Sequence, residues 1–587
     1  MFLITTANQK FWKPESEKLF LGEWCTPHQA SKSIEHAKRE TLPFLWNDRK
    51  KVIESLGYIN KLFERYLKAL SGQLNELHQV DYPLRYWRII IGPWLYFFLM
   101  GMYDRFLNIN SAIDSGKATN TWIPEPPSIP YIPKDYNTFI GWSVNDDYNL
   151  YLYSLIIVHS GKIPYEEKSE PLDLPQDKYD PKNYGIKSLL KSALHPLFKK
   201  VPERYKKIVF ISSYFNFKDL LRLQLYLKQF PALYSSPGPV PNKAPDLSLR
   251  NRLILPEGEN PFEKLIRDLV PKQIPTAYLE SYQSINKEAL DYFPKNPELI
   301  LTANDLFGGE SFKFWAAHHV SRGCKLAGIQ HGGGYGSRYI DPTLFNESRV
   351  CDYYYTWGWK LNCNAKTRAL PAGKLLGLKK TRPSLNGDIL VIGTNAPRYP
   401  YRWGNGDIIG PEMIEYFENQ SKFFHSLNTE AQAMLLFRLY PADYDWGSKS
   451  RLIELAPGLR IYQGNMSMMD QLKQSRLCVC TNNSTTFLET LSINYPTLVF
   501  WDAARYELRK NAKPYFESLK EAGIFHDTPE SAGNRVNEIF ENPIIWWNSR
   551  KVQESVKYFC SQFAQTKGLN RWKNELKKIL LENNSNK

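Results

Sequence analysis

The sequence lacks an apolar run long enough to cross a membrane. The longest such run, from Ile89 to Met102, is shorter than the roughly 20 residues that a spanning helix needs, and it contains Gly92-Pro93. We therefore expect a buried helix there. The N-terminal stretch Met-Phe-Leu-Ile-Thr-Thr-Ala has no basic leader, so we expect no signal peptide.

Cysteine is also scarce, with 7 residues in a chain of 587. The cysteines are scattered and odd in number, which argues against a disulfide framework and favours a reducing cytoplasm. Cys478 and Cys480 lie in one predicted strand, and we expect them on opposite faces, unable to form a metal or redox pair.

Acidic residues are outnumbered by basic ones, 60 against 75, for a formal net charge of +15. This excess suits contact with an anionic polymer or lipid. The chain has no zinc finger, RNA-recognition signature or dense Arg/Lys tract, so we expect no nucleic-acid partner. We expect a cytoplasmic protein, with a peripheral position at the inner face of the cytoplasmic membrane.

The chain is too long for one ordinary core, and its patterns predict an N-terminal domain over 1–375, a second domain over 386–546 and a helical tail over 547–587. A helical region is expected from about 33 to 110, and the proline-rich stretch 122–133 is expected to be a loop or a crossing segment. Buried strands are expected at 2–6, 18–21, 208–211, 299–302, 326–330, 353–357, 388–393, 434–439, 459–462, 477–480 and 497–500. Their alternation with helices from residue 388 onward predicts a doubly wound parallel sheet.

A polar turn follows the predicted strand at 477–480 and precedes a short helix. It contains Asn483, Ser484, Thr485 and Thr486. A helix N-terminus offers free N–H groups and a partial positive charge, which suit a phosphate. The alternative is a plain helix cap. Five consecutive small polar residues, from 482 to 486, exceed what one cap needs, so we favour an anion site.

A glycine-rich turn follows the strand at 326–330, in the sequence Gly328-Ile-Gln-His-Gly-Gly-Gly-Tyr-Gly336. Glycines allow close approach of the backbone to a ligand, and a histidine beside them can donate to a phosphate or act as an acid or base. The candidate residues are Gln330, His331, Gly332, Gly333 and Gly334. The alternative is a structural turn with a capping histidine.

Three carboxylates follow predicted strands in the N-terminal half and are candidates for a general base. Asp305 and Glu310 lie between the strand at 299–302 and a helix predicted to begin at Ser311, and Glu23 follows the second strand. Acidic residues also favour helix starts for electrostatic reasons, so both interpretations stay open.

Polar residues also end two strands of the C-terminal domain. Arg438 can aim a guanidinium at a phosphate or sugar carboxylate, and Thr394 ends the first strand. Asp443 and Asp445 are weak evidence for a metal site. We predict no metal site and no cofactor.

These motifs resemble those of bacterial surface-polysaccharide transferases. Asn483-Ser-Thr-Thr486, followed by Leu488-Glu489 and Pro496, is similar to a pattern of capsule Kdo transferases and CDP-glycerol polymerases. Phe20-Leu-Gly-Glu-Trp-Cys25, the glycine-rich turn and Thr356-Trp-Gly-Trp359 resemble a transferase family encoded in O-antigen and surface-glycan regions. Related CMP-sugar enzymes carry His-Pro where this chain has Tyr440-Pro441.

The resemblance implies an α/β fold of GT-B type, with two Rossmann-like domains facing a cleft and a helical insertion in the N-terminal half. It implies a glycosyltransferase that works without a metal and uses a nucleotide sugar as donor, with a CMP-linked nonulosonic or Kdo-like acid as the expected donor. Ser484 and Thr485 would hold the donor phosphate, with Glu489 and Arg438 nearby. The acceptor would be a glycan or lipid-linked glycan. Alternatives are CDP-glycerol-type phosphotransfer and non-catalytic binding of a sugar or nucleotide.

Overall fold

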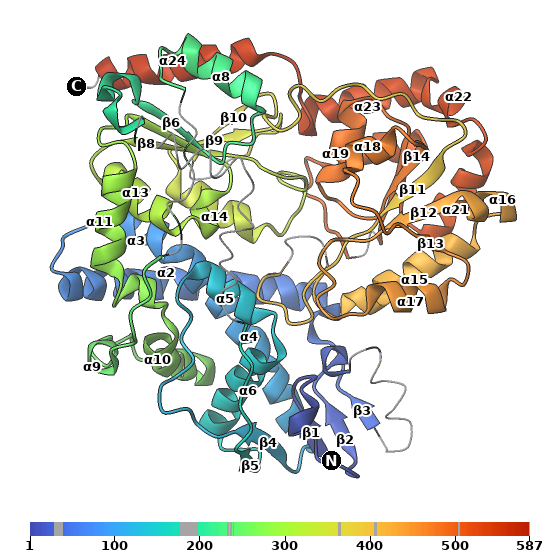
Figure 1. The fold of residues 1–587 in the computed structure, drawn as a ribbon. Coiled ribbons are helices and arrows are strands. Elements are labelled where there is room, and N and C mark those ends of the chain that lie inside the picture. The colour runs from blue at the N-terminus through green and yellow to red at the C-terminus, as the bar shows by residue number, and fades with distance from the viewer. Residues whose placement is uncertain are drawn as a thin grey trace. The chain divides into compact units, whose positions relative to one another are not determined.

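The computed structural model describes the chain in two compact units (Figure 1). The first contains 1–212, 232–326 and 397–403, and the second contains 213–231, 327–396 and 404–587. The described residues are 1–587 except 27, 29–38, 176–195, 197, 232–233, 235–237, 239, 362–364, 404–407, 503–504 and 586–587. The predicted domain boundaries at 375, 386 and 546 stay a prediction.

The first unit combines short parallel strands with long helices. Its strands are β1 (Phe2–Ile4), β2 (Lys18–Phe20), β3 (Arg39–Thr41), β4 (Thr121–Pro124), β5 (Tyr165–Lys168), β6 (Ile208–Ile211) and β7 (Leu299–Thr302). They pair in parallel as β1-β2-β3, β4-β5 and β6-β7. Its helices are α2 (Arg49–His78), α3 (Leu84–Ile90), α4 (Gly92–Asp114), α5 (Tyr136–Ser143), α6 (Asp146–Ser160), α9 (Leu247–Arg250), α10 (Pro261–Gln273), α11 (Tyr282–Tyr292), α12 (Asp305–Gly308) and α13 (Glu310–Ser321).

The apolar run from Ile89 to Met102 forms buried helix, as predicted, but not one continuous helix. Helix α3 ends at Ile90 and α4 begins at Gly92. Pro93 is accepted there because the first turn of a helix needs no N–H donor from that position. Within the described residues, no helix is both long and apolar enough to cross a membrane.

The second unit is built on a six-stranded parallel sheet in the order β13-β12-β11-β14-β15-β16. Its strands are β11 (Asp388–Ile392), β12 (Leu435–Arg438), β13 (Arg460–Ile461), β14 (Ser475–Cys480), β15 (Thr497–Phe500) and β16 (Phe525–His526). Numbered along the chain, this is the order 3-2-1-4-5-6 of a doubly wound dinucleotide fold. Along the chain, β12 and β13 are added on one side of β11, and β14, β15 and β16 are added on its other side. The strand order therefore reverses between the neighbouring strands β11 and β14.

Helices cover both faces of this sheet (Figure 1). One face carries α15 (Glu412–His425), α17 (Ser448–Leu455) and α21 (Pro529–Ile539), whose apolar side chains share a core with the strands. The other face carries α18 (Met468–Leu472), α19 (Thr485–Ser492) and α23 (Arg550–Phe563). Strand β14 is buried along its whole length, as a strand covered on both faces must be.

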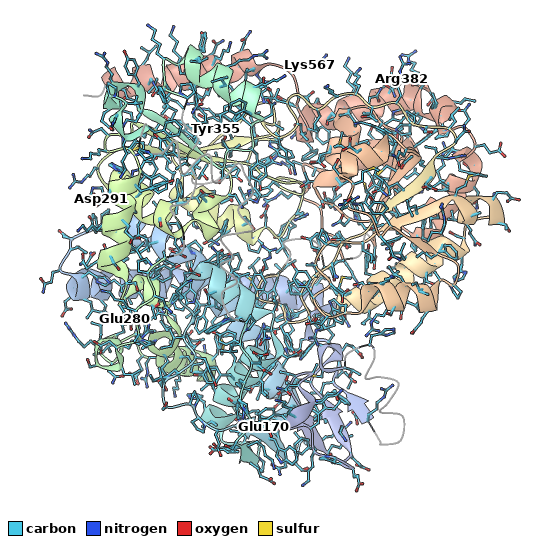
Figure 2. All side chains as sticks on the ribbon, in the orientation of Figure 1. Glu170, Glu280, Asp291, Tyr355, Arg382 and Lys567 are labelled. Carbon is cyan, nitrogen blue, oxygen red and sulfur yellow. The ribbon has the colours of Figure 1, made fainter. Side chains whose placement is uncertain are left out.

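The second unit also holds three parallel strands and further helices. The strands are β8 (Lys325–Ile329), β9 (Tyr353–Thr356) and β10 (Lys366–Ala369), and the helices are α8 (Phe217–Tyr226), α14 (Pro342–Val350), α16 (Thr429–Met434), α20 (Lys513–Glu521), α22 (Pro543–Trp547) and α24 (Leu569–Ser585). Tyr355 of β9, labelled in Figure 2, packs edge-on against Trp572 of α24, with ring centroids 4.8 Å apart. This contact fixes the terminal helix to the strands.

The predicted α/β class, with parallel strands and a helical insertion in the N-terminal half, is confirmed. Two expectations were wrong. The helical region does not extend back to residue 33, because Arg39–Thr41 form strand β3 and the first long helix, α2, begins at Arg49. Cys478 and Cys480 do not face opposite ways, and their Sγ atoms lie 3.9 Å apart. Residues two apart on a strand point to the same face.

Candidate functional site

The reversal point of the six-stranded sheet lies between the carboxyl ends of β11 and β14. The Thr481 hydroxyl donates to the Ile392 carbonyl at 2.9 Å. The Tyr416 hydroxyl bridges the two ends, 2.8 Å from the Thr481 Oγ1 and 3.0 Å from the backbone N–H of Thr394. Open α/β sheets bind their ligands just outside such a point. Thr394, predicted from the sequence, therefore lies at the expected place.

The predicted polar turn leads directly from β14 into α19. Ser484 is the N-cap residue and Thr485 is the first helical residue. The Ser484 side chain forms no cap hydrogen bond within the described part of the chain, and it is half-buried together with Thr485 and Thr486. The first N–H groups of a helix have no partners within the helix, and they favour an anion.

The glycine-rich turn contacts this polar turn inside the second unit. The Gly333 N–H donates to the Thr485 hydroxyl oxygen at 2.9 Å. A Cβ on Gly333 would overlap the Ser484 carbonyl, so the approach requires glycine. Arg338 donates to the Asn483 carbonyl, and the Asn483 side chain donates to the Ser337 hydroxyl at 3.2 Å. The two strongest sequence candidates thus lie in direct contact.

Gln330 fixes the shape of the glycine-rich turn, and its role toward a ligand stays a prediction. Its side-chain oxygen accepts from the Trp357 N–H at 2.9 Å and from the Trp359 indole at 2.8 Å. Its amide donates to the Gly332 carbonyl at 2.8 Å. Gly334 has a left-handed backbone with φ of +81°, which a residue with a side chain seldom adopts.

His331 lies beside a buried carboxylic acid that the sequence analysis missed. Its Nδ1 is 3.6 Å from Oε1 of Glu347 on α14, and the Tyr335 hydroxyl lies 3.3 Å from its Nε2. Glu347 accepts from the Tyr354 hydroxyl at 2.6 Å. Burial raises the pKa of Glu347 well above its usual range, although the Tyr354 hydrogen bond opposes the shift.

The positively charged side chain of Lys374 also lies beside the candidate site. Its ammonium pairs with Glu489 of α19 at 3.1 Å and lies 5.8 Å from the ring centroid of Tyr214. Tyr214 in turn stacks on His331, with centroids 6.2 Å apart. The sequence analysis did not single out Lys374. No local spacing links Lys374 to Glu489, so only the fold reveals it.

Arg438 ends β12 as predicted, but its guanidinium is engaged within the domain. It donates to the Met466 carbonyl at 3.0 Å and to the Gln471 side chain at 2.6 Å, and it lies over the Tyr462 ring. Its role toward a phosphate stays a prediction.

Glu310, the first candidate base, belongs to the first unit and is buried in a network of its own. It pairs with the Lys313 ammonium at 2.9 Å and accepts from the Tyr278 hydroxyl at 2.9 Å and the Tyr136 N–H at 3.0 Å. Burial raises the pKa of Glu310, and the neighbouring ammonium opposes that shift. These contacts suit a structural ion pair, and its role as a base stays a prediction.

The other two candidate bases also lie in the first unit. Asp305 begins α12, and burial raises the pKa of its carboxyl. Glu23 is exposed in a single 3-10 turn, Glu23–Cys25, after β2. No metal-binding cluster of three His, Cys, Asp or Glu side chains occurs among the described residues, which include Asp443 and Asp445.

A pocket that the sequence analysis missed opens at the carboxyl ends of β14 and β15. Arg505 lies there between Glu412, at 3.2 Å, and Glu415, with Asp502 at 3.7 Å. The lining residues are Ile408, Glu412, Glu415, Tyr416, Asn419, Gln420, Thr481, Phe500, Trp501, Asp502, Arg505, Tyr506 and Pro529. Thr481 and Tyr416 belong both to this pocket and to the reversal point of the sheet, so the pocket adjoins the polar turn.

Residues 1–580 match the LIC12162 family of transferases. The chain belongs to this family. No curated protein matches it.

Several solved structures are distantly similar to this chain. The UDP-GlcNAc 2-epimerase of Neisseria meningitidis bound to UDP-GlcNAc is 10% identical, with a TM-score of 0.33, over 64% of this chain and 99% of that one. MurG of Acinetobacter baumannii is 10% identical, with a TM-score of 0.32, over 63% and 99%. MnaA of S. aureus with UDP is 12% identical, with a TM-score of 0.33, over 54% and 86%.

Proposed function

We propose that the protein is a glycosyltransferase that moves a sugar from a nucleotide donor to a cell-surface glycan acceptor. The observation that carries the proposal is the meeting of the glycine-rich turn with the start of α19, through Gly333 and Thr485. Together with membership of a transferase family, this favours a site for a leaving phosphate.

Polar and cationic groups of the second unit can stabilise the negative charge that develops on a departing phosphate. The acceptor hydroxyl oxygen attacks the anomeric carbon, and the bond from that carbon to the phosphate oxygen breaks. The N–H groups of α19 and the Ser484 hydroxyl can receive the phosphate. His331 and Lys374 lie beside them and can add positive charge. The acceptor proton must pass to a base, for which Glu310, Asp305 and Glu23 stay candidates.

The donor is proposed to be a CMP-linked sugar acid of nonulosonic or Kdo-like type. A nucleoside monophosphate leaving group has one phosphate, whose charge a helix N-terminus and a few side chains can balance without a metal. The resemblance of the Asn483-Ser-Thr-Thr486 turn to that of capsule Kdo transferases supports the same donor class.

The test begins with a thermal-shift screen against CMP, CDP, UDP and GDP. The protein is then incubated with a sugar donor that carries the nucleotide that bound, and the reaction products are identified. Glycosyl transfer from a CMP-sugar releases CMP and leaves a glycoside. Phosphotransfer from CDP-glycerol releases CMP but leaves a phosphodiester in the product. A binding protein would show nucleotide affinity without release of any free nucleotide, which would refute the enzyme proposal.

A further inference from the structure

Helix α8 carries large apolar side chains on its outer face. Leu220 and Leu223 pack inward, whereas Phe217 is 61% exposed, Leu225 58% and Tyr226 48%. Single exposed apolar residues are ordinary on protein surfaces. Three on one helix of ten residues are unusual, because this helix already has a separate apolar face that packs inward.

Cations are interleaved with these apolar side chains. Lys218 and Arg222 are exposed on the same helix, and Arg222 keeps 69% of its side chain exposed despite a weak pairing with Asp219 at 3.6 Å. Lys228 follows the helix and is also exposed. An outer face that combines aromatic and aliphatic residues with Lys and Arg is typical of a helix that lies in a membrane interface.

Helix α24 lies beside α8 and extends this face (Figure 1). The Lys573 ammonium lies 4.6 Å from the centroid of the Tyr226 ring, which joins the two helices. Trp572, Leu576 and Ile579 of α24 are buried, whereas Lys577, Lys578 and Leu581 are exposed. We call the residues Phe217, Lys218, Arg222, Leu225, Tyr226, Lys577, Lys578 and Leu581 the α8–α24 surface.

We propose that the α8–α24 surface binds an anionic lipid bilayer. The apolar side chains enter the headgroup region, and the cations lie at the level of the phosphates. A second copy of the chain is a poorer occupant. A two-fold symmetric contact would place this surface against itself and bring its lysines and arginine together.

The position of the surface connects it to the candidate site. Tyr214, which stacks on His331, precedes the first residue of α8 by three positions. A bilayer on the outer face of α8 therefore lies close to the site, where the hydroxyl of a lipid-linked glycan could reach it. This consequence rests on the proposed function, whereas lipid binding itself does not.

Vesicle flotation of the full chain, without nucleotide, tests the proposal. We expect a bound fraction at least about fivefold higher with phosphatidylcholine–phosphatidylglycerol vesicles than with phosphatidylcholine alone, and release at high salt. Phe217→Ser/Leu225→Ser and Lys577→Glu/Lys578→Glu should each lower binding by a similar factor. Matched controls are Ile545→Ser, which changes a residue 73% exposed on α22, and Lys449→Glu/Lys513→Glu, which changes exposed lysines on α17 and α20.

Two measurements keep the result interpretable. Each variant should retain the wild-type melting temperature and any nucleotide-induced shift, which shows that the fold and the site are intact. No binding of the wild type to anionic vesicles, or equal loss in the control variants, would overturn the proposal. Concentration-dependent dimerisation that the Phe217→Ser/Leu225→Ser variant abolishes, without vesicle binding, would assign the surface to a second copy instead.

Discussion

The backbone N–H of Gly333 donates a hydrogen bond of 2.9 Å to the hydroxyl oxygen of Thr485, a residue 152 positions later in the chain. It joins the glycine-rich turn to the first residue of α19. The Thr485 hydroxyl therefore accepts a hydrogen bond from the glycine-rich turn. It also lies at the start of the helix, where we propose that the donor phosphate binds. Substitutions at neighbouring positions 484 and 485 should consequently have different effects.

Thr485→Val should lower the free energy of unfolding by about 1 kcal/mol, because the Gly333 N–H loses its acceptor. Ser484→Ala should leave stability nearly unchanged, since this side chain forms no cap hydrogen bond with the described residues. Both variants should weaken CMP binding, by about 1–3 kcal/mol for a lost hydrogen bond to a charged group. Denaturant unfolding and calorimetric titration measure the two effects. Unchanged CMP affinity in both variants would remove the phosphate role.

His331→Ala should lower turnover by roughly 10²-fold or more if the imidazole assists the leaving phosphate. His159→Ala, which changes an exposed histidine on α6, is the control and should keep wild-type turnover. Turnover and melting temperature are measured on the same preparation. A lower melting temperature with normal turnover per folded molecule would make His331 a structural residue.

Glu347→Gln should change stability in a pH-dependent way. Burial raises the pKa of this carboxyl in the folded protein, whereas an unfolded glutamate titrates at about 4.3. The folded state therefore holds the proton more tightly, and the resulting stability is present below about pH 4.3 and is lost as pH rises toward the folded pKa. The unfolding free energy of wild type relative to Glu347→Gln should fall as the pH rises above about 4.3. Parallel curves from denaturant unfolding would contradict the shift.

Glu310→Gln should destabilise the protein by about 3–5 kcal/mol, because it leaves the buried Lys313 ammonium without its partner. Replacing both, as Glu310→Gln/Lys313→Met, should recover much of this loss. Turnover per folded molecule should stay near the wild-type value if Glu310 is purely structural. A large fall in turnover with unchanged stability would instead identify Glu310 as the base.

CMP should raise the melting temperature more than UDP or GDP. The stabilisation should follow mass action, about 2.7 kcal/mol at a hundredfold excess over the dissociation constant. Chelator should leave activity unchanged, because the proposed site balances the charge of one phosphate with protein groups alone. A larger shift with UDP or GDP, or activity that needs magnesium or manganese, would overturn the CMP donor while leaving glycosyl transfer open.

The sequence by itself determined five of the six strands in the doubly wound sheet of the second unit, all but β16. Apolar runs such as Leu477 to Cys480, each followed by a polar turn and an amphipathic segment, predicted β14, α19 and β15 close to their observed bounds. It also indicated the polar and glycine-rich turns, because small polar residues and glycines are needed locally, where a strand ends and a helix begins. These signals depend only on residues close together in the chain.

Tertiary structure alone decided which of these residues meet. The sequence assigned His331 and Ser484 to different domains, yet their turns touch within one unit, and it missed Glu347 and Lys374 altogether. It could not show that Arg438 turns toward Gln471, or that Glu310 is paired with Lys313. Except for that last pair, which lies three residues apart on one helix, these contacts join distant segments. Side-chain packing and strand order, rather than local spacing, bring such segments together.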